Sequence, residues 1–333
     1  MLKMIPSLKQ KFTISANAKE EHKQLVLDVS KFTPKVYNKN GEIMHFFYLQ
    51  DDMCTHKPYS FSSPEWSVTN HIIWDRYNKG LPIHFYSHNN IFQSYTNCDR
   101  KFGILIESEA IVPNDYQLVY EKPEVINQYK GIFTHSSKLL DRYANARFMP
   151  GSGVWYGSDV GGGVMDKDRY MKKTKNISLL SSDKVMCDLH LYRKDMAFYY
   201  KRNGKVDTFG TFDGGKKVKA SETLTDYRYS IAIENYISPF YFTEKILNCF
   251  AAMTIPIYVG ATEIEKFFNP DGIIKIDRMD YNELDKIIKK CCKEDYEERL
   301  YAVIDNFNRV QKYICYEDYL FETYSDFILD ENL

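Results

Sequence analysis

The residues best placed to do chemistry are Glu244 and Lys245, which follow Thr243 at the expected start of a helix. The Thr243 hydroxyl can cap that helix by accepting a hydrogen bond from a backbone amide of the first turn. Lys245 is then a cation beside the positive end of the helix dipole, which is unfavourable unless an anion binds there. The segment therefore predicts a diphosphate site built from first-turn amides and a lysine. The alternatives are a solvated lysine and, for Glu244, a carboxylate that only caps the helix.

This helix is expected at 243–253, between two apolar runs, 227–235 and 255–260, that are typical of buried strands. Similar runs recur along the chain with helix-compatible segments between them. Further strands are expected at 45–49, 82–86, 102–107, 131–135, 175–182 and 205–210, and helices at 64–77, 136–146 and 190–201. Alternating strands and helices predict parallel sheets that helices cover on both faces.

The chain changes character at Gly151–Asp168, which holds six of its 16 glycines. Because glycine weakens regular structure, this segment predicts a linker between two domains. We expect a Rossmann-like domain at 1–160 and a second at 161–310, with ligands bound in a cleft at the carboxyl ends of the strands. The remaining residues, 311–333, are expected to form a helical tail that closes a domain, an interpretation favoured over a partner-binding helix.

Composition restricts the class of protein. The 333 residues are 44% hydrophobic and 15% aromatic, which excludes disorder as an overall description, and the formal net charge of -1 argues against a nucleic-acid partner. Seven scattered cysteines without a Cys-x-x-Cys pair make a disulfide framework or structural zinc improbable. Neither a signal peptide nor a transmembrane segment is recognisable, and every charged residue after Lys312 is acidic, so a cytoplasmic protein is expected.

Three motifs between Tyr227 and Gly260 resemble the donor-binding signature of the family-10 α-1,3/4-fucosyltransferases. The family pattern runs Phe-Glu-Asn-Ser, a short loop, Tyr-x-Thr-Glu-Lys, a helix, then Pro-Val/Ile and Gly. The matching residues here are Glu234-Asn235, Tyr241-Phe242-Thr243-Glu244-Lys245 and Ile255-Pro256-Ile257-Tyr258-Val259-Gly260. Weaker similarity continues upstream through Ser181-Ser182-Asp183-Lys184, His190, Arg193 and Val206-Asp207-x-Phe209-Gly210.

The resemblance implies an α/β protein of the GT-B type, in which two Rossmann-like domains face each other across a cleft. It also implies an inverting glycosyltransferase that transfers L-fucose from GDP-fucose to a hydroxyl of an oligosaccharide or glycoconjugate acceptor, without a metal or other cofactor. No Asp-x-Asp motif stands at a strand end, since Asp166 and Asp168 lie in the glycine-rich segment. Donor-binding roles then fall on Arg193, Asn235, Tyr241, Glu244 and Lys245, with Ser182, Lys184, Glu234 and Thr243 as further candidates.

An inverting transfer needs a base that removes the acceptor proton, and a carboxylate at the carboxyl end of a strand on the opposite domain suits this role. Ile106-Glu107-Ser108 resembles a family segment at such a strand end, which makes Glu107 the first choice and Glu109 the second. Histidines at or near strand ends are further candidates for a base or for the acceptor cleft: His45, His84, His88 and His135. Trp66, Trp74 and Trp155 could stack on an acceptor sugar or pack in the core.

Tyr236 departs from the family pattern, because the family usually has serine after Glu-Asn. A bulky ring beside the donor pocket predicts that the transferred sugar could differ from fucose. Two alternatives therefore stay open: the same scaffold with another GDP-activated sugar, and a non-catalytic carbohydrate- or nucleotide-binding protein. The presence of both Arg193 and Lys245 favours an enzyme, because fixed cations stabilise the charge that grows on a departing diphosphate.

Overall fold

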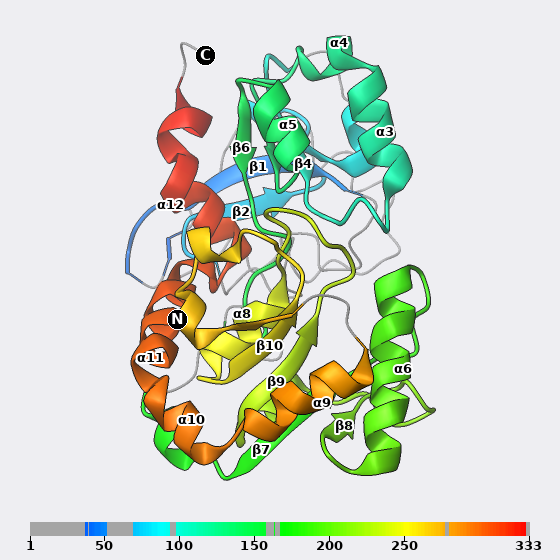
Figure 1. Cartoon of the computed structure of the whole chain (residues 1–333). Helices are drawn as coiled ribbons and strands as arrows, with labels where there is room; N and C mark the ends of the chain where they lie inside the picture. Colours follow the sequence, from blue (N-terminus) through cyan, green and yellow to red (C-terminus); the bar gives the residue numbers. More distant parts are fainter. Residues whose placement is uncertain are drawn as a thin grey trace, which may run out of the picture.

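The computed structural model describes residues 37–38, 40–51, 69–93, 98–157, 163, 167–276 and 280–330. It contains two parallel sheets with helices packed around them (Figure 1). Within the described residues, no helix is both long enough and apolar enough to cross a membrane.

The N-terminal sheet has six strands in the order β2-β1-β3-β4-β5-β6. All adjacent pairs are parallel. The strands are β1 (His45–Gln50), β2 (Ile72–Asp75), β3 (Ile83–Ser87), β4 (Arg100–Leu105), β5 (Gly131–Thr134) and β6 (Ala146–Phe148). Its helices include η2 (His88–Gln93), α3 (Pro113–Glu121), α4 (Pro123–Ile126) and α5 (Ser137–Arg142). The strands expected at 45–49, 82–86, 102–107 and 131–135 are confirmed, with ends shifted by up to two residues.

The helix expected at 64–77 is wrong in its second half, where β2 occupies Ile72–Asp75. Residues 64–68, which include Trp66, lie outside the described residues. Ile72, Ile73 and Trp74 are consecutive and all buried. A helix would place three consecutive residues on different faces, whereas a strand between two other layers buries each of them.

The C-terminal sheet has five strands in the order β11-β10-β9-β7-β8, again all parallel. The strands are β7 (Lys175–Leu180), β8 (Asp207–Phe209), β9 (Tyr227–Ile233), β10 (Ile255–Val259) and β11 (Ile274–Lys275). The helices are α6 (Asp188–Asn203), α7 (Ala220–Leu224), α8 (Glu244–Ala251), α9 (Tyr281–Lys290), α10 (Lys293–Glu298) and α11 (Leu300–Val310), with short 3-10 turns η3 to η6 at Arg169–Lys172, Ile264–Lys266, Pro270–Gly272 and Gln311–Tyr313. The strand, helix and strand expected around 227–260 are confirmed.

The last helix, α12 (Tyr316–Leu329), returns from the C-terminal half to pack against the N-terminal sheet (Figure 1). Arg100 donates to the Ile328 carbonyl at 2.7 Å, and the Tyr324 hydroxyl donates to the Phe148 carbonyl at 2.7 Å. Asp318 accepts hydrogen bonds from Asn70, beside β2. The expected helical tail thus covers the first sheet. The division into 1–160, 161–310 and 311–333 remains a prediction, and its first boundary lies outside the described residues.

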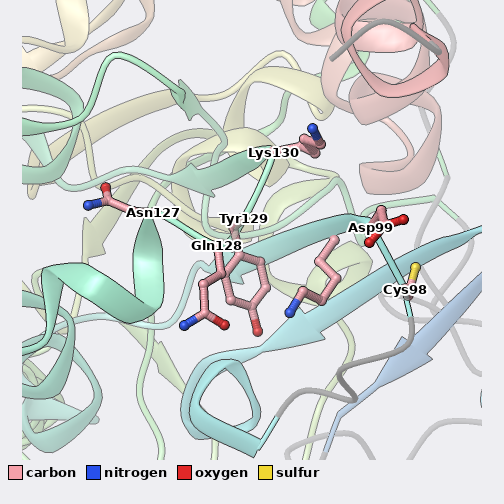
Figure 2. Close-up of a pocket in the computed structure, with 7 residues that line it drawn as sticks. Cys98, Asp99, Asn127, Gln128, Tyr129 and Lys130 are labelled. Carbon is pink, nitrogen blue, oxygen red and sulfur yellow. The ribbon is translucent and has the colours of Figure 1, made fainter.

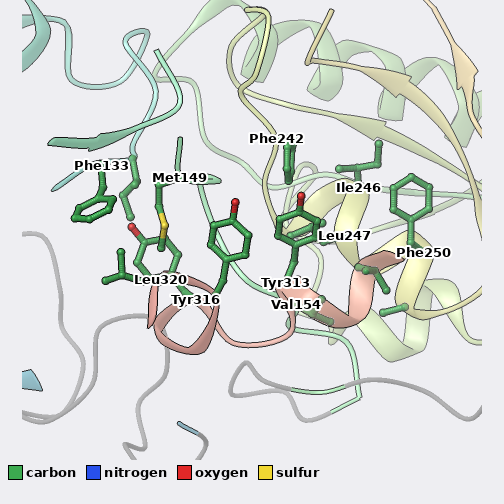
Figure 3. Close-up of a cluster of buried hydrophobic side chains, with 14 of the residues drawn as sticks. Phe133, Met149, Val154, Phe242, Ile246, Leu247, Phe250, Tyr313, Tyr316 and Leu320 are labelled. Carbon is green, nitrogen blue, oxygen red and sulfur yellow. The ribbon is translucent and has the colours of Figure 1, made fainter. Parts of the chain in front are cut away.

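A continuous apolar cluster joins the two halves between the sheets (Figure 3). It includes Phe133 from β5, Leu247 and Phe250 from α8, Tyr313, and Leu320 from α12. Burying such side chains contributes about 1.5–3 kcal/mol each, so this cluster fixes the two sheets against each other. The structure therefore holds the carboxyl edges of the two sheets in a defined relationship.

Candidate active site

The expected helix cap at Thr243 is present and is coupled to a buried glutamate. The Thr243 hydroxyl accepts from the Lys245 backbone amide at 3.4 Å. Glu234 follows β9 and has no exposed side-chain surface. Its carboxylate accepts hydrogen bonds from the Thr243 amide at 2.9 Å and from the Thr243 hydroxyl at 2.6 Å. Glu234 thus attaches the start of α8 to the carboxyl end of β9.

The Lys245 ammonium group is held between two carboxylates. It lies 3.0 Å from Glu244 Oε1 and 3.4 Å from Glu234 Oε2, and 3.0 Å from the Thr243 hydroxyl. Burial alone would lower the pKa of Lys245, but its attraction to Glu244 and Glu234 outweighs burial and raises that pKa. The side chains of Lys245 and Glu244 are 23% and 34% exposed, so this pair remains open to a ligand.

Arg193 approaches the same place from α6. It is buried, and its Nη1 donates to the carbonyl of Ile233, the last residue of β9, at 2.9 Å. Its Nε is also buried and has no hydrogen-bond partner. Burial lowers the pKa of Arg193 despite the opposing attraction of Glu234 and Glu244, yet a guanidinium stays charged at neutral pH. Arg193 is therefore a buried cation whose Nε–H group is unpaired.

His190 lies one turn before Arg193 on α6 and is also buried. Burial, together with repulsion from Arg193, Lys245 and Lys184, lowers the pKa of His190 to about 4. The imidazole is therefore neutral at physiological pH, and positive charge at this edge comes from Arg193 and the lysines. The sequence predicted no role for His190, which appeared only within the weaker upstream similarity. Its position beside the cations depends on the packing of α6 against β9, which the sequence does not show.

Glu107 faces this group from the N-terminal sheet, just beyond the end of β4. Its Oε1 accepts hydrogen bonds from Asn235 Nδ2 at 3.3 Å and from the Tyr241 hydroxyl at 3.3 Å. Glu109, two residues on, accepts from the Tyr236 hydroxyl at 3.2 Å. Both carboxylates that the sequence suggested as a base therefore contact the donor-side segment.

The main-chain carbonyl of Glu107 is also fixed. The Tyr116 hydroxyl of α3 donates to it at 2.7 Å, and His135 Nε2 lies 3.2 Å from it. His135 is 1% exposed, and its ring packs edge-on against Tyr241 at a centroid distance of 4.6 Å. Burial lowers the pKa of His135 to about 4, so it is neutral. The sequence did not predict a role for Tyr116, because this residue belongs to no recognisable motif. Its hydroxyl reaches the Glu107 carbonyl only because α3 packs over the end of β4.

The other residues that the sequence suggested have different surroundings. Lys184 is exposed in the loop after β7 and is near enough to His190 to affect its pKa, and Ser182 is half-buried in the same loop. His84 is buried within β3, where its Nδ1 is 2.9 Å from the Tyr86 hydroxyl, and the His45 ring lies tilted against Phe321 of α12. Trp74 is buried in the apolar cluster that joins the sheets, and the Trp155 amide donates to Asn248 on α8.

Two other features bear on ligand binding. A pocket of about 410 Å³ opens at the amino ends of β4 and β5, away from Glu107 (Figure 2). Its lining residues are Cys98, Asp99, Lys101, Asn127, Gln128, Tyr129 and Lys130.

Across the part of the chain that the structure describes, no group of three or more His, Cys, Asp or Glu side chains has the arrangement of a metal site.

Comparison with known proteins agrees with this arrangement. Residues 170–318 match the family model for the C-terminal part of glycosyltransferase family 10 (fucosyltransferase). The chain is 34% identical over 68 residues to an alpha-(1,3)-fucosyltransferase of Helicobacter pylori, covering 20% of this chain and 14% of that protein. It is 35% identical over 77 residues to a human 3-galactosyl-N-acetylglucosaminide 4-alpha-L-fucosyltransferase, covering 22% and 21%. The matches therefore span only about a seventh to a fifth of these relatives.

Solved structures extend the similarity in fold to most of the chain. A crystal structure of an alpha1,3-fucosyltransferase with GDP superposes with a TM-score of 0.53 at 13% identity, covering 86% of this chain and 90% of that one. The structure with GDP-fucose gives a TM-score of 0.52 at 13% identity, covering 87% and 92%. The two parallel sheets meeting at their carboxyl edges are thus a GT-B fold, and residues 170–318 are similar to the C-terminal part of glycosyltransferase family 10, the fucosyltransferase family.

Proposed function

We propose that this protein is an inverting glycosyltransferase that transfers L-fucose from GDP-fucose to a hydroxyl of a glycan acceptor. The observation that carries the proposal is the meeting of Glu107 with Asn235 and Tyr241, beside the Arg193 and Lys245 cations. A carboxylate thus stands on one sheet and a diphosphate-binding group on the other. A direct displacement at an anomeric carbon needs both, because one partner loses a proton while the other gains negative charge.

The charges around Lys245 suit a site that exchanges ion pairs when the donor arrives. Arg193 and Lys245 are balanced by Glu234 and Glu244 in the absence of a ligand. Glu234 is fully buried and bonded to Thr243, so it stays in place. Glu244 is the more exposed carboxylate, and in the proposed reaction it turns from Lys245 to a donor hydroxyl. That rotation leaves the ammonium, the Arg193 guanidinium and the α8 amides to hold the diphosphate.

The proposed roles of the remaining residues follow from their contacts. Asn235 and Tyr241 line the sugar-nucleotide pocket and orient Glu107 until the acceptor hydroxyl reaches it. Glu107 accepts the acceptor proton as the hydroxyl attacks the face of the sugar opposite to GDP. Arg193 and Lys245 stabilise the developing charge on GDP more strongly in the transition state than in the ground state, which is the condition for rate enhancement.

The deciding experiment is a calorimetric titration with GDP, GDP-fucose and UDP, first in chelator and then in magnesium, followed by GDP release with a panel of GDP-sugars. We expect GDP to bind in chelator, GDP to bind more tightly than UDP, and GDP-fucose to be the best donor. Binding that requires magnesium would contradict the metal-free mechanism. Tighter binding of UDP would contradict the donor class.

A second candidate, transfer of another GDP-activated sugar, is favoured by Tyr236. This ring packs near Tyr241 at a centroid distance of 6.1 Å, and its hydroxyl bonds to Glu109. The test is the same donor panel with Tyr236→Ser, which creates the residue usual in the family, and with Tyr236→Phe as the control that keeps the ring. A donor preference that shifts to GDP-fucose only in Tyr236→Ser would support the second candidate.

A further inference from the structure

His88 occupies the turn where β3 ends and η2 begins, beside the end of β4. Its side chain is 3% exposed. The Glu107 backbone amide donates to His88 Nε2 at 3.4 Å, and His88 Nδ1 lies 3.2 Å from Asp115 Oδ2 in the first turn of α3. The imidazole therefore stands between a carboxylate and the backbone of the proposed base.

The contact with the Glu107 amide defines how Nε2 must be protonated. A ring nitrogen that accepts from a backbone amide has to carry a lone pair, so Nε2 holds no proton. On the other side of the ring, Nδ1 is buried and makes no hydrogen bond, although Asp115 Oδ2 lies 3.2 Å from it. The contact that ties His88 to Glu107 is therefore the one at Nε2, and Asp115 places a negative charge beside the opposite edge of the ring.

The backbone of His88 gives a second, independent observation. Its φ of +53° lies in the left-handed region, which among the described non-glycine residues is shared only by Met253, after α8. A side chain with a Cβ is disfavoured there, at a cost of about 1–3 kcal/mol, and such conformations persist where the surroundings impose them, often at functional sites. Here the left-handed turn is what brings the ring to the Glu107 amide.

We propose that His88 is a positioning residue for Glu107, an inference that rests on the proposed function of Glu107 as the base. Tyr116 and His135 hold the Glu107 carbonyl, and His88 holds its amide. The main chain is thus held on both sides, and the carboxylate that it carries accepts from Asn235, Tyr241 and the Ser108 amide. Without His88 the amide loses its partner and the carboxylate moves away from the acceptor hydroxyl.

The test compares His88→Asn with His88→Leu in the full chain. Asparagine tolerates the left-handed conformation, and its amide can both accept and donate. Leucine is of similar size but can do neither. We expect His88→Leu to lower kcat by about 10²-fold, as displacement of a reacting group by roughly 1 Å does, with the KM for donor and the Kd for GDP unchanged. We expect His88→Asn to recover at least a tenth of the parent kcat.

The matched control is His71→Leu, which removes a histidine beside the same sheet that contacts Glu322 rather than Glu107. Its kcat should equal that of the parent. Thermal unfolding of all three variants shows whether a loss of kcat follows from a loss of folded protein. Equal kcat values for His88→Asn and His88→Leu, in folded proteins, would overturn the proposal.

A double-mutant cycle separates positioning from a general structural effect. In the background of Glu107→Gln, the positioning of a base no longer matters, so His88→Leu should cause no further fall in kcat. A second fall of about the same factor would show that His88 acts independently of Glu107 and would overturn the proposal.

A measurement without substrate keeps the inference distinct from the proposed function. Nitrogen-15 NMR of the full chain, with His88→Asn used to assign the signal, should show no proton on His88 Nε2, the atom that accepts from the Glu107 amide. A proton on Nε2 would overturn the inference. An inactive parent protein that nevertheless shows no proton on Nε2 would overturn the proposed transfer reaction but leave the geometry of His88 in place.

Discussion

The side-chain amide of Asn235 lies 3.3 Å from the carboxylate of Glu107, although 128 residues separate them in the chain. One follows β9 and the other follows β4, so this bond exists only because the carboxyl edges of the two sheets meet. This bond orients the Glu107 carboxylate towards the donor-side residues and holds it close to them.

Glu107→Gln should lower transfer by about 10²–10⁴-fold while leaving GDP affinity nearly unchanged. The amide of glutamine keeps an oxygen that can accept from Asn235 and Tyr241, so the local structure survives and only the basic group is lost. Transfer is measured as fucosylated product and affinity by calorimetry. Glu109→Gln is the control and should retain most of the activity, because Glu109 contacts Tyr236 instead. The opposite ranking would move the role of base to Glu109.

Arg193→Gln should lower kcat by about 10²–10³-fold, the loss observed when one fixed donor to a developing charge is removed. Glutamine can still donate to the Ile233 carbonyl but carries no charge. Arg202→Gln, on the exposed last turn of α6, serves as the control and should retain full activity. Turnover of Arg193→Gln within threefold of the parent would show that Arg193 is a structural residue.

Lys245→Met should destabilise the protein as well as inactivate it, because it leaves the buried Glu234 carboxylate without its counter-charge. Breaking a buried ion pair from one side costs about 3 kcal/mol, measured as the free energy of unfolding in urea. A solvated lysine, which is one alternative that the sequence left open, could be removed with little loss of stability. The contact with Glu234 changes that expectation.

The matched control for Lys245→Met is the double variant Glu234→Gln/Lys245→Met, which should recover most of the lost stability but none of the activity. The deficit of the single variant should also shrink as pH falls. Burial raises the pKa of Glu234, so protonation on acidification removes the uncompensated charge. A stability equal to that of the parent at all pH values would contradict the buried pair.

His135, which contacts the Glu107 carbonyl, predicts that the folded protein loses stability in acid. Burial lowers the pKa of His135 to about 4 from 6.5, so the unfolded chain takes up a proton at a pH where the folded protein does not. The stability contributed by neutral His135 is therefore complete above pH 6.5 and is lost as pH falls towards 4, by about 3 kcal/mol at most. His135→Gln, which can still donate to the Glu107 carbonyl, removes this titration. As pH falls from 7 to 4.5, the unfolding free energy of the variant should decrease less than that of the parent. If the two proteins lose stability equally over this range, the prediction is contradicted.

Asp318 predicts how firmly α12 is held to the N-terminal sheet. Its carboxylate accepts from the Asn70 amide at 2.7 Å and from the Asn70 side chain at 2.6 Å. Asp318→Leu should lower the unfolding free energy by about 1–3 kcal/mol for each donor left without a partner. Asp326→Leu, at an exposed position of the same helix, should change it by less than about 0.5 kcal/mol. Equal effects would show that the Asp318 bonds contribute nothing.

The sequence predicted the parts of this molecule that depend on neighbouring residues. The cap at Thr243, the helix after it and the strands on either side follow from residue types within a few positions. The strand at Ile72–Asp75 was missed because an apolar run of four residues has no periodicity that separates a strand from part of a helix.

The contacts that define the candidate site depend on tertiary structure. Lys245 meets Glu234 across a turn, and Glu107 meets Tyr241 across two sheets. Neither distance can be read from spacing. The same holds for Tyr116, which reaches the Glu107 carbonyl only because α3 lies over β4. Sequence thus identified the chemical groups, and packing determined which of them touch.

The return of α12 to the N-terminal sheet means that the chain connects the two halves twice, and the two connections touch each other. The Val154 amide donates to the carbonyls of both Tyr313 and Ile314 at 3.1 Å. A Cβ at Gly153 would lie 2.9 Å from the Ile314 oxygen, so the two segments pass as closely as backbones allow. Two adjacent connections restrain the sheets against sliding or rotating past each other, in addition to the apolar cluster between them. The same restraint keeps Glu107 beside Asn235 and Tyr241.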